Sequence, residues 1–76
     1  MKTLLIRGND EPPNELRSII EAGSTEVDER TELSPAARHA ADRVVVWNGK
    51  QLVLDDRRLR WPEDRDELRM LFQTGG

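Results

Sequence analysis

The chain has no cysteine among its 76 residues and only one histidine, His39. The lack of cysteine excludes disulfides, thiolate metal sites and thiol catalysis, and it fits a reducing compartment. A single histidine excludes any two-histidine metal site. In a helix around His39, the residues four positions away are Pro35 and Arg43, so no carboxylate partner is present. We therefore interpret His39 as a structural or surface side chain.

Long apolar runs are also missing. No segment approaches the ~20 apolar residues that span a bilayer. Met1-Lys2 opens directly into the short run Thr3–Ile6, which is too short for a secretory signal core. The sequence therefore predicts a cytoplasmic protein with no membrane partner.

Lysine is scarce, since Lys2 and Lys50 are the only two among 12 basic residues. The 15 acidic residues give a formal net charge of −3, which argues against broad nucleic-acid binding. Opposite charges alternate along the chain, and this pattern is typical of a solvated surface.

The strongest local signal is Asn48-Gly49, set between Arg43–Trp47 and Lys50–Asp55. Asn-Gly favours a two-residue type I′ turn, which would pair the flanking runs as an antiparallel hairpin and fix their register. Trp47 shares a strand face with Val45, which favours packing in the core. A partly buried Trp47 would instead be a candidate interface anchor.

The rest of the chain alternates between strand and helix patterns. Thr3–Ile6 is typical of a central strand, whereas Leu16, Ile19 and Ile20 lie at helical spacing. Ser34 before Pro35 predicts an N-cap and a first helical turn. The predicted elements are strands at 3–6, 25–28, 43–47 and 50–55, and helices at 13–22, 35–41 and 62–73.

This order predicts a single domain over residues 1–76 with α/β architecture. We expect a small three-layer β-α-β-α-β-β-α fold. Its sheet would be mostly parallel, with one antiparallel edge strand contributed by the Asn-Gly hairpin.

The segment 4–47 resembles the first half of a bacterial response-regulator receiver domain. The matching features are the opening strand, the helix around Glu15-Leu16-Arg17, the Ala22-Gly23 turn into an edge strand, and the alanine-rich helix before the strand 43–47. The resemblance covers a little over half of the chain and implies a receiver-like α/β fold.

The departures from that family bear on function. A receiver holds Mg²⁺ with an acidic pair directly after its first strand, where this chain has Arg7 and Gly8. Its phosphoacceptor aspartate ends the third strand, where this chain has Trp47. Asn9 and Asp10 would face no acceptor carboxylate. The resemblance therefore implies a truncated, phosphorylation-incompetent relative that works as a protein-docking module.

No motif supports a cofactor or a metal. Asp55-Asp56 follows a strand, as some Mg²⁺ ligands do, but the adjacent Arg57 and Arg58 compete for these carboxylates. Gly8 is followed by neither G-x-G-x-x-G nor a P-loop lysine. We predict no catalytic residue, no cofactor and no metal, and hence a protein that is not an enzyme.

Two surfaces are predicted to bind a partner protein or a second copy of the chain. One is the outer edge of the strand Gln51–Asp55, whose unpaired backbone would extend a sheet. The other is a cationic-aromatic patch, which would dock an acidic partner and consists of Arg57, Arg58, Arg60 and Trp61. The predicted partner-binding residues are Gln51, Val53, Asp55, Arg57, Arg58, Arg60 and Trp61.

Two alternative functions remain open on the sequence. Arg57, Arg58, Arg60 and Trp61 are residue types that grip phosphate and stack bases, so they also suit weak nucleic-acid binding. The carboxyl-terminal Gly75-Gly76 resembles the terminus of ubiquitin-like modifiers and sulfur carriers, although the predicted order of elements differs from theirs.

Overall fold

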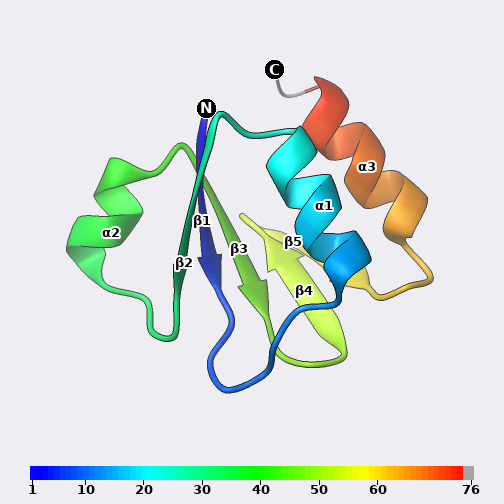
Figure 1. Ribbon diagram of the computed structural model, residues 1–76, viewed down its shortest axis with the longest axis horizontal. Helices are drawn as coiled ribbons and strands as arrows, with labels where there is room; N and C mark the ends of the chain where they lie inside the picture. Colours follow the sequence, from blue (N-terminus) through cyan, green and yellow to red (C-terminus); the bar gives the residue numbers. More distant parts are fainter. Residues whose placement is uncertain (75–76) are drawn as a thin grey trace.

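The structure is a computed structural model that describes residues 1–74. Five strands and three helices follow one another along the chain (Figure 1). They are β1 (Lys2–Ile6), α1 (Asn14–Ala22), β2 (Glu26–Arg30), α2 (Pro35–Ala40), β3 (Arg43–Trp47), β4 (Gln51–Leu54), β5 (Arg57–Arg60) and α3 (Arg65–Thr74). Within residues 1–74, no helix has the length and apolar character needed to cross a membrane.

All strands join one mixed sheet in the order β2-β1-β3-β4-β5. β1 pairs in parallel with β2 and β3, whereas β4 pairs antiparallel with both β3 and β5. The predicted α/β class is confirmed. The prediction of a mostly parallel sheet with one antiparallel edge strand is wrong. Two of the four strand pairings are antiparallel, namely β3 with β4 and β4 with β5.

The local signals for α1 and α2 are confirmed. Leu16, Ile19 and Ile20 form the buried side of α1, and Gly23 is its C-cap. The N–H of Ala37 donates a hydrogen bond of 3.2 Å to the Ser34 hydroxyl, which caps α2. The predicted edge strand at 25–28 is also present as β2, displaced to Glu26–Arg30.

The hairpin between β3 and β4 is present, but its predicted register is wrong. Trp47 pairs with Leu52, so Gly49 and Lys50 occupy the centre of the turn. The side-chain carbonyl of Asn48 accepts hydrogen bonds from the N–H groups of Lys50 (3.0 Å) and Gln51 (2.7 Å). Asn48 thus acts as a hydrogen-bond acceptor before the turn, and Gly49 alone adopts the left-handed backbone, with φ of 96°.

The sequence-based prediction missed β5. The sequence predicts no strand between the strand at 50–55 and the helix at 62–73. In the structure, Asp55-Asp56 forms a turn, with φ of 54° at Asp55, and Arg57–Arg60 pairs back along β4. Helix α3 therefore begins only at Arg65, after the turn that follows β5.

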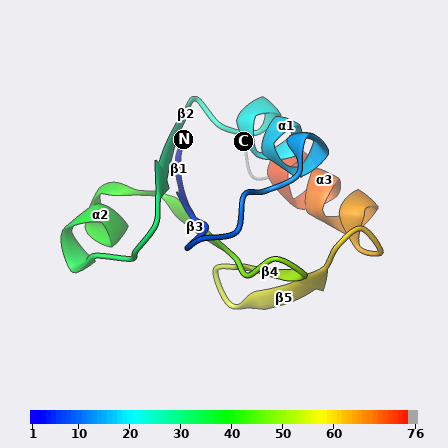
Figure 2. The ribbon, with the colours of Figure 1, turned by 60° about the horizontal axis from the view of Figure 1, so that its bottom comes forward.

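The two faces of the sheet are covered unequally. α1 and α3 pack on one face around a main cluster, and α2 lies on the opposite face (Figure 2). Ala37 of α2 packs with Leu4 and Ile6, next to the partly buried Val44 and Val46. The main cluster consists of Leu5, Leu16, Ile19, Ile20, Val45, Trp47, Leu52, Leu54, Leu59, Leu68 and Phe72. The predicted core position of Trp47, which is 4% exposed, is confirmed.

Candidate functional site

The structure separates the predicted cationic-aromatic patch into two groups. Side chains alternate between the faces of a strand, and Leu59 of β5 is buried under the helices. Arg57 and Trp61 share that helical face: the Arg57 guanidinium lies 3.6 Å from Glu67, and Trp61 packs against the main cluster. Arg58 lies on the opposite face. The four residues Arg57, Arg58, Arg60 and Trp61 therefore do not form one surface.

Four of the predicted partner-binding residues do lie together, on the face opposite α1 and α3. Val53 pairs across the strands with Arg58, and Gln51 pairs with Arg60. Val53 also pairs with the partly buried Val46 of β3. We call the surface formed by Val46, Gln51, Val53, Arg58 and Arg60 the open face.

The arginines of the open face differ in their partners. Within residues 1–74, Arg58 forms no ion pair and its side chain is exposed. Arg60 is held by Asp64, whose carboxylate accepts hydrogen bonds from the Arg60 N–H at 2.8 Å and from its Nε at 3.3 Å. The first of these bonds, with help from the second, lowers the pKa of Asp64. Arg58 is therefore the basic residue of the open face that is left for a partner.

The prediction that the outer edge of Gln51–Asp55 is unpaired is wrong. β4 is an interior strand, hydrogen-bonded to β3 on one side and to β5 on the other. The sequence held a signal for β5, because Leu59 between Arg58 and Arg60 alternates apolar and charged residues. The high charge of the segment concealed it.

Asp55 and Asp56 serve as turn residues in the structure. The Asp55 carboxylate accepts a hydrogen bond of 3.2 Å from the N–H of Val44, and the Asp55 N–H donates to the Val44 carbonyl at 2.9 Å. These bonds continue the ladder between β3 and β4. No cluster of three acidic or histidine ligands suited to a metal occurs among residues 1–74.

The predicted receiver-like arrangement would place a phosphorylation site at the ends of β1 and β3. Arg7 follows β1 and forms a 2.8 Å ion pair with Glu29 of β2. Trp47 at the end of β3 is buried in the main cluster. The Asp10 side chain lies against Gly49, where an added Cβ would come within 3.2 Å of it. At this end of the sheet, the two positions are therefore occupied by an arginine held in an ion pair and by a buried tryptophan.

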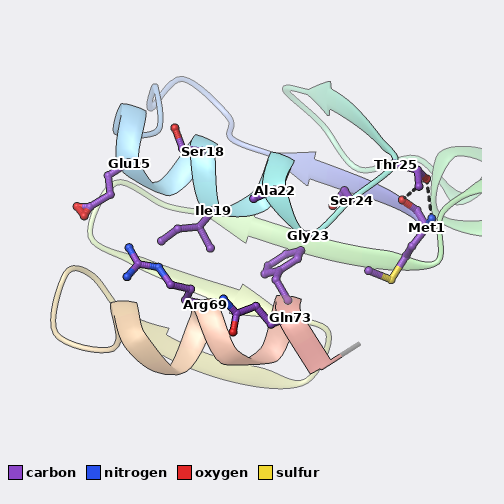
Figure 3. A pocket seen from close by; sticks show the side chains of 11 residues that line it. Met1, Glu15, Ser18, Ile19, Ala22, Gly23, Ser24, Thr25, Arg69 and Gln73 are labelled. Carbon is purple, nitrogen blue, oxygen red and sulfur yellow. Dashed lines mark hydrogen bonds between the residues drawn. The ribbon is translucent and has the colours of Figure 1, made fainter. Parts of the chain in front are cut away.

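A groove that the sequence did not predict runs between α1 and α3, with a volume of about 840 Å³. Figure 3 shows Ile19 and Gly23 on the α1 side and Arg69 and Gln73 on α3. At one end, the amino group of Met1 donates a 2.6 Å hydrogen bond to the Thr25 hydroxyl. No sequence motif indicates this groove, because its residues come from α1 and α3, which are distant along the chain.

The remaining prediction concerns Gly75-Gly76, which lies outside the described residues. Comparison with known proteins adds no assignment: no family model matches the chain, and no curated protein or solved structure shows significant similarity to it.

Proposed function

We propose that this protein is a non-catalytic protein–protein interaction module that binds an acidic partner on its open face. The proposal includes the three-layer receiver-like architecture, a phosphorylation-incompetent site and a cytoplasmic location. The observation that carries it is the unequal cover of the sheet, because α2 packs over Leu4 and Ile6 while the same face of β4 and β5 carries Arg58, which forms no ion pair with residues 1–74.

The chemistry of the open face suits a partner that combines acidic and apolar groups. Val46 and Val53 are only partly buried, so covering them would remove further apolar surface from water. Arg58 stands beside Val53 in the neighbouring strand and supplies a guanidinium for a carboxylate. Gln51 adds hydrogen-bonding groups at the end of the hairpin.

The nucleic-acid alternative has less support from this geometry. Arg57 is directed to the helical face, where it meets Glu67, and Arg60 is bound to Asp64. Trp61 packs on the main cluster, which leaves its ring less available for stacking on a base. The Gly75-Gly76 carrier remains an alternative of a different class, tested by deleting those two residues.

The test compares two charge reversals in the same strand. Tagged full-length protein, Arg58→Glu and Arg57→Glu are each used to capture proteins from the cytosol of the source organism. We expect Arg58→Glu to lose partners that Arg57→Glu retains, because Arg58 lies on the open face and Arg57 lies on the opposite face of the sheet. Folding of each variant is checked by circular dichroism.

Captured partners are then measured individually against the three proteins. A binding constant that weakens for Arg58→Glu and stays near the original value for Arg57→Glu supports the proposal. Identical sets of captured proteins for both variants would contradict it. A covalent adduct that survives denaturation and requires Gly76 would support the carrier alternative instead.

A further inference from the structure

The two free edges of the sheet differ in the backbone groups that they expose. In the described part of the chain, β2 pairs only with β1, and successive residues of a strand direct their N–H and C=O groups to opposite sides. The Arg30 carbonyl accepts a 3.0 Å hydrogen bond from the Arg7 N–H, so Arg30 faces β1, as do Glu26 and Asp28. Val27 and Glu29 therefore direct their N–H and C=O groups outward.

The edge formed by β5 is largely closed. The Arg60 N–H donates to the Asp64 carboxylate at 2.8 Å, and the Arg60 carbonyl accepts from the Asp64 N–H at 3.0 Å. The N–H of Trp61 is directed to β4, where it meets the Lys50 carbonyl at 3.4 Å. Arg58 is then the residue of β5 whose backbone groups remain for another strand. A strand with one available residue is a poor template for pairing.

We propose that β2 pairs antiparallel with β2 of a second copy of this chain, about a two-fold axis at Asp28. In this register, Val27 of one copy lies opposite Glu29 of the other, and the two residues exchange backbone hydrogen bonds on both sides of the axis. The outward-facing groups of β2 are then all satisfied, and the two sheets become one continuous sheet.

Charge complementarity favours a second copy as the occupant of this edge. Glu26, Asp28 and Arg30 share the face of the sheet on which α2 lies, because alternate residues of a strand point to the same side. In the proposed register, Glu26 of each copy lies opposite Arg30 of the other, which gives two cross-strand pairs of opposite charge. The two end residues of this series, Glu26 and Arg30, therefore complement in charge the end residues of a second copy.

Asp28, at the centre of the paired strands, limits the affinity of the dimer. Asp28 meets its own copy at the axis, and like charges directly opposite one another destabilise a strand pair. Each Asp28 carboxylate is bound by the Arg30 Nε of its own chain at 3.0 Å, which reduces this repulsion. We expect a weak dimer that Asp28→Asn strengthens.

The alternative occupant with complementary charge is β5 of another copy, which carries Arg57, Arg58 and Arg60. That contact would join unlike edges and grow into an open filament. The bonds between Arg60 and Asp64 oppose it, because they occupy the backbone N–H and C=O groups of Arg60 on the outer edge of β5. The two-fold pairing of β2 closes after two copies and places both open faces on the same side of the combined sheet, which would suit a bivalent partner.

The experiment is sedimentation equilibrium of the full chain from about 10 μM to about 1 mM, a range that covers weak association. The variants are Glu26→Arg, Arg30→Glu and the double exchange Glu26→Arg/Arg30→Glu. Either single change places like charges opposite each other, and we expect the dissociation constant to rise about tenfold or more. The double exchange restores opposite charges and should return it to near the original value.

Proline variants test the backbone pairing separately. Val27→Pro removes an outward N–H without removing a hydrogen bond to β1, and it should weaken the dimer about tenfold or more. Arg58→Pro makes the same change at the β5 edge and should leave the dimer intact. If a proline variant fails to fold, the charge exchange still decides the question.

A chain that stays monomeric across the concentration range would overturn the proposal, as would single charge variants that associate like the original protein. Concentration-dependent growth beyond a dimer would favour the filament. Because association is measured without any partner protein, failure here leaves the proposed function of the open face standing, and failure of the capture experiment leaves the dimer standing.

Discussion

Gly23 allows α1 and α3 to approach each other more closely than any other residue type would. A Cβ added at Gly23 would lie 2.5 Å from the Cβ of Phe72, 2.7 Å from its Cδ1 and 2.9 Å from its Cγ. Rotating the Phe72 ring cannot relieve the first of these contacts, because the Phe72 Cβ is fixed to the backbone of α3. Helix α3 would have to move by roughly 1 Å to restore ordinary carbon–carbon contact.

Two opposing effects determine the stability of Gly23→Ala. The φ of Gly23 is −96°, which alanine adopts without strain, so reduced freedom of the unfolded chain favours the variant by about 0.4–1 kcal/mol. Overpacking against Phe72, which is 2% exposed, costs about 1–3 kcal/mol. We expect a net loss of about 1–2 kcal/mol in the free energy of unfolding, and a Tm lower by roughly 4–16 °C.

Urea unfolding followed by tryptophan fluorescence and circular dichroism measures this loss. Gly8→Asn is the control, because the space at Gly8 is open and asparagine tolerates its φ of 58°. We expect that control to change stability by less than about 0.5 kcal/mol. A Gly23→Ala variant that is unchanged or more stable would refute the close packing of α1 on α3.

Two further predictions concern local contacts. Ser34→Ala removes the side-chain cap of α2 and should lower the free energy of unfolding by about 1 kcal/mol in urea titrations; a loss under about 0.3 kcal/mol would contradict the cap. The hydrogen bonds from Arg60 lower the pKa of Asp64, so the stability supplied by its ionised form is present above the unfolded pKa of about 3.9 and is lost as the pH falls through the folded pKa. We therefore expect the urea midpoint of the original protein to fall more steeply below about pH 4 than that of Asp64→Asn. If the urea midpoints of the two proteins fall equally steeply with decreasing pH, the contact between Arg60 and Asp64 is contradicted.

Several elements were predictable because their signals are local. The run at β1, the spacing of Leu16, Ile19 and Ile20, and the Ser34-Pro35 pair each depend on neighbouring residues and on one structural period. The α/β class followed from the order of these segments. The prediction of the seven partner-binding residues had a different basis, because it required an assumption about how distant segments face one another.

The amino-acid sequence by itself thus determined most of the helices, the central strands and the presence of a hairpin. Tertiary structure decided the register of that hairpin, in which Trp47 pairs with Leu52 and both side chains are buried in the main cluster with residues of α1 and α3. It also decided that residues 57–60 form the strand β5 along β4, and side-chain alternation in that strand places Arg57 and Arg58 on opposite faces of the sheet. Local propensities set the conformation of a segment, but the surface it exposes depends on which segments cover its edges and faces, and those contacts join residues far apart in the chain.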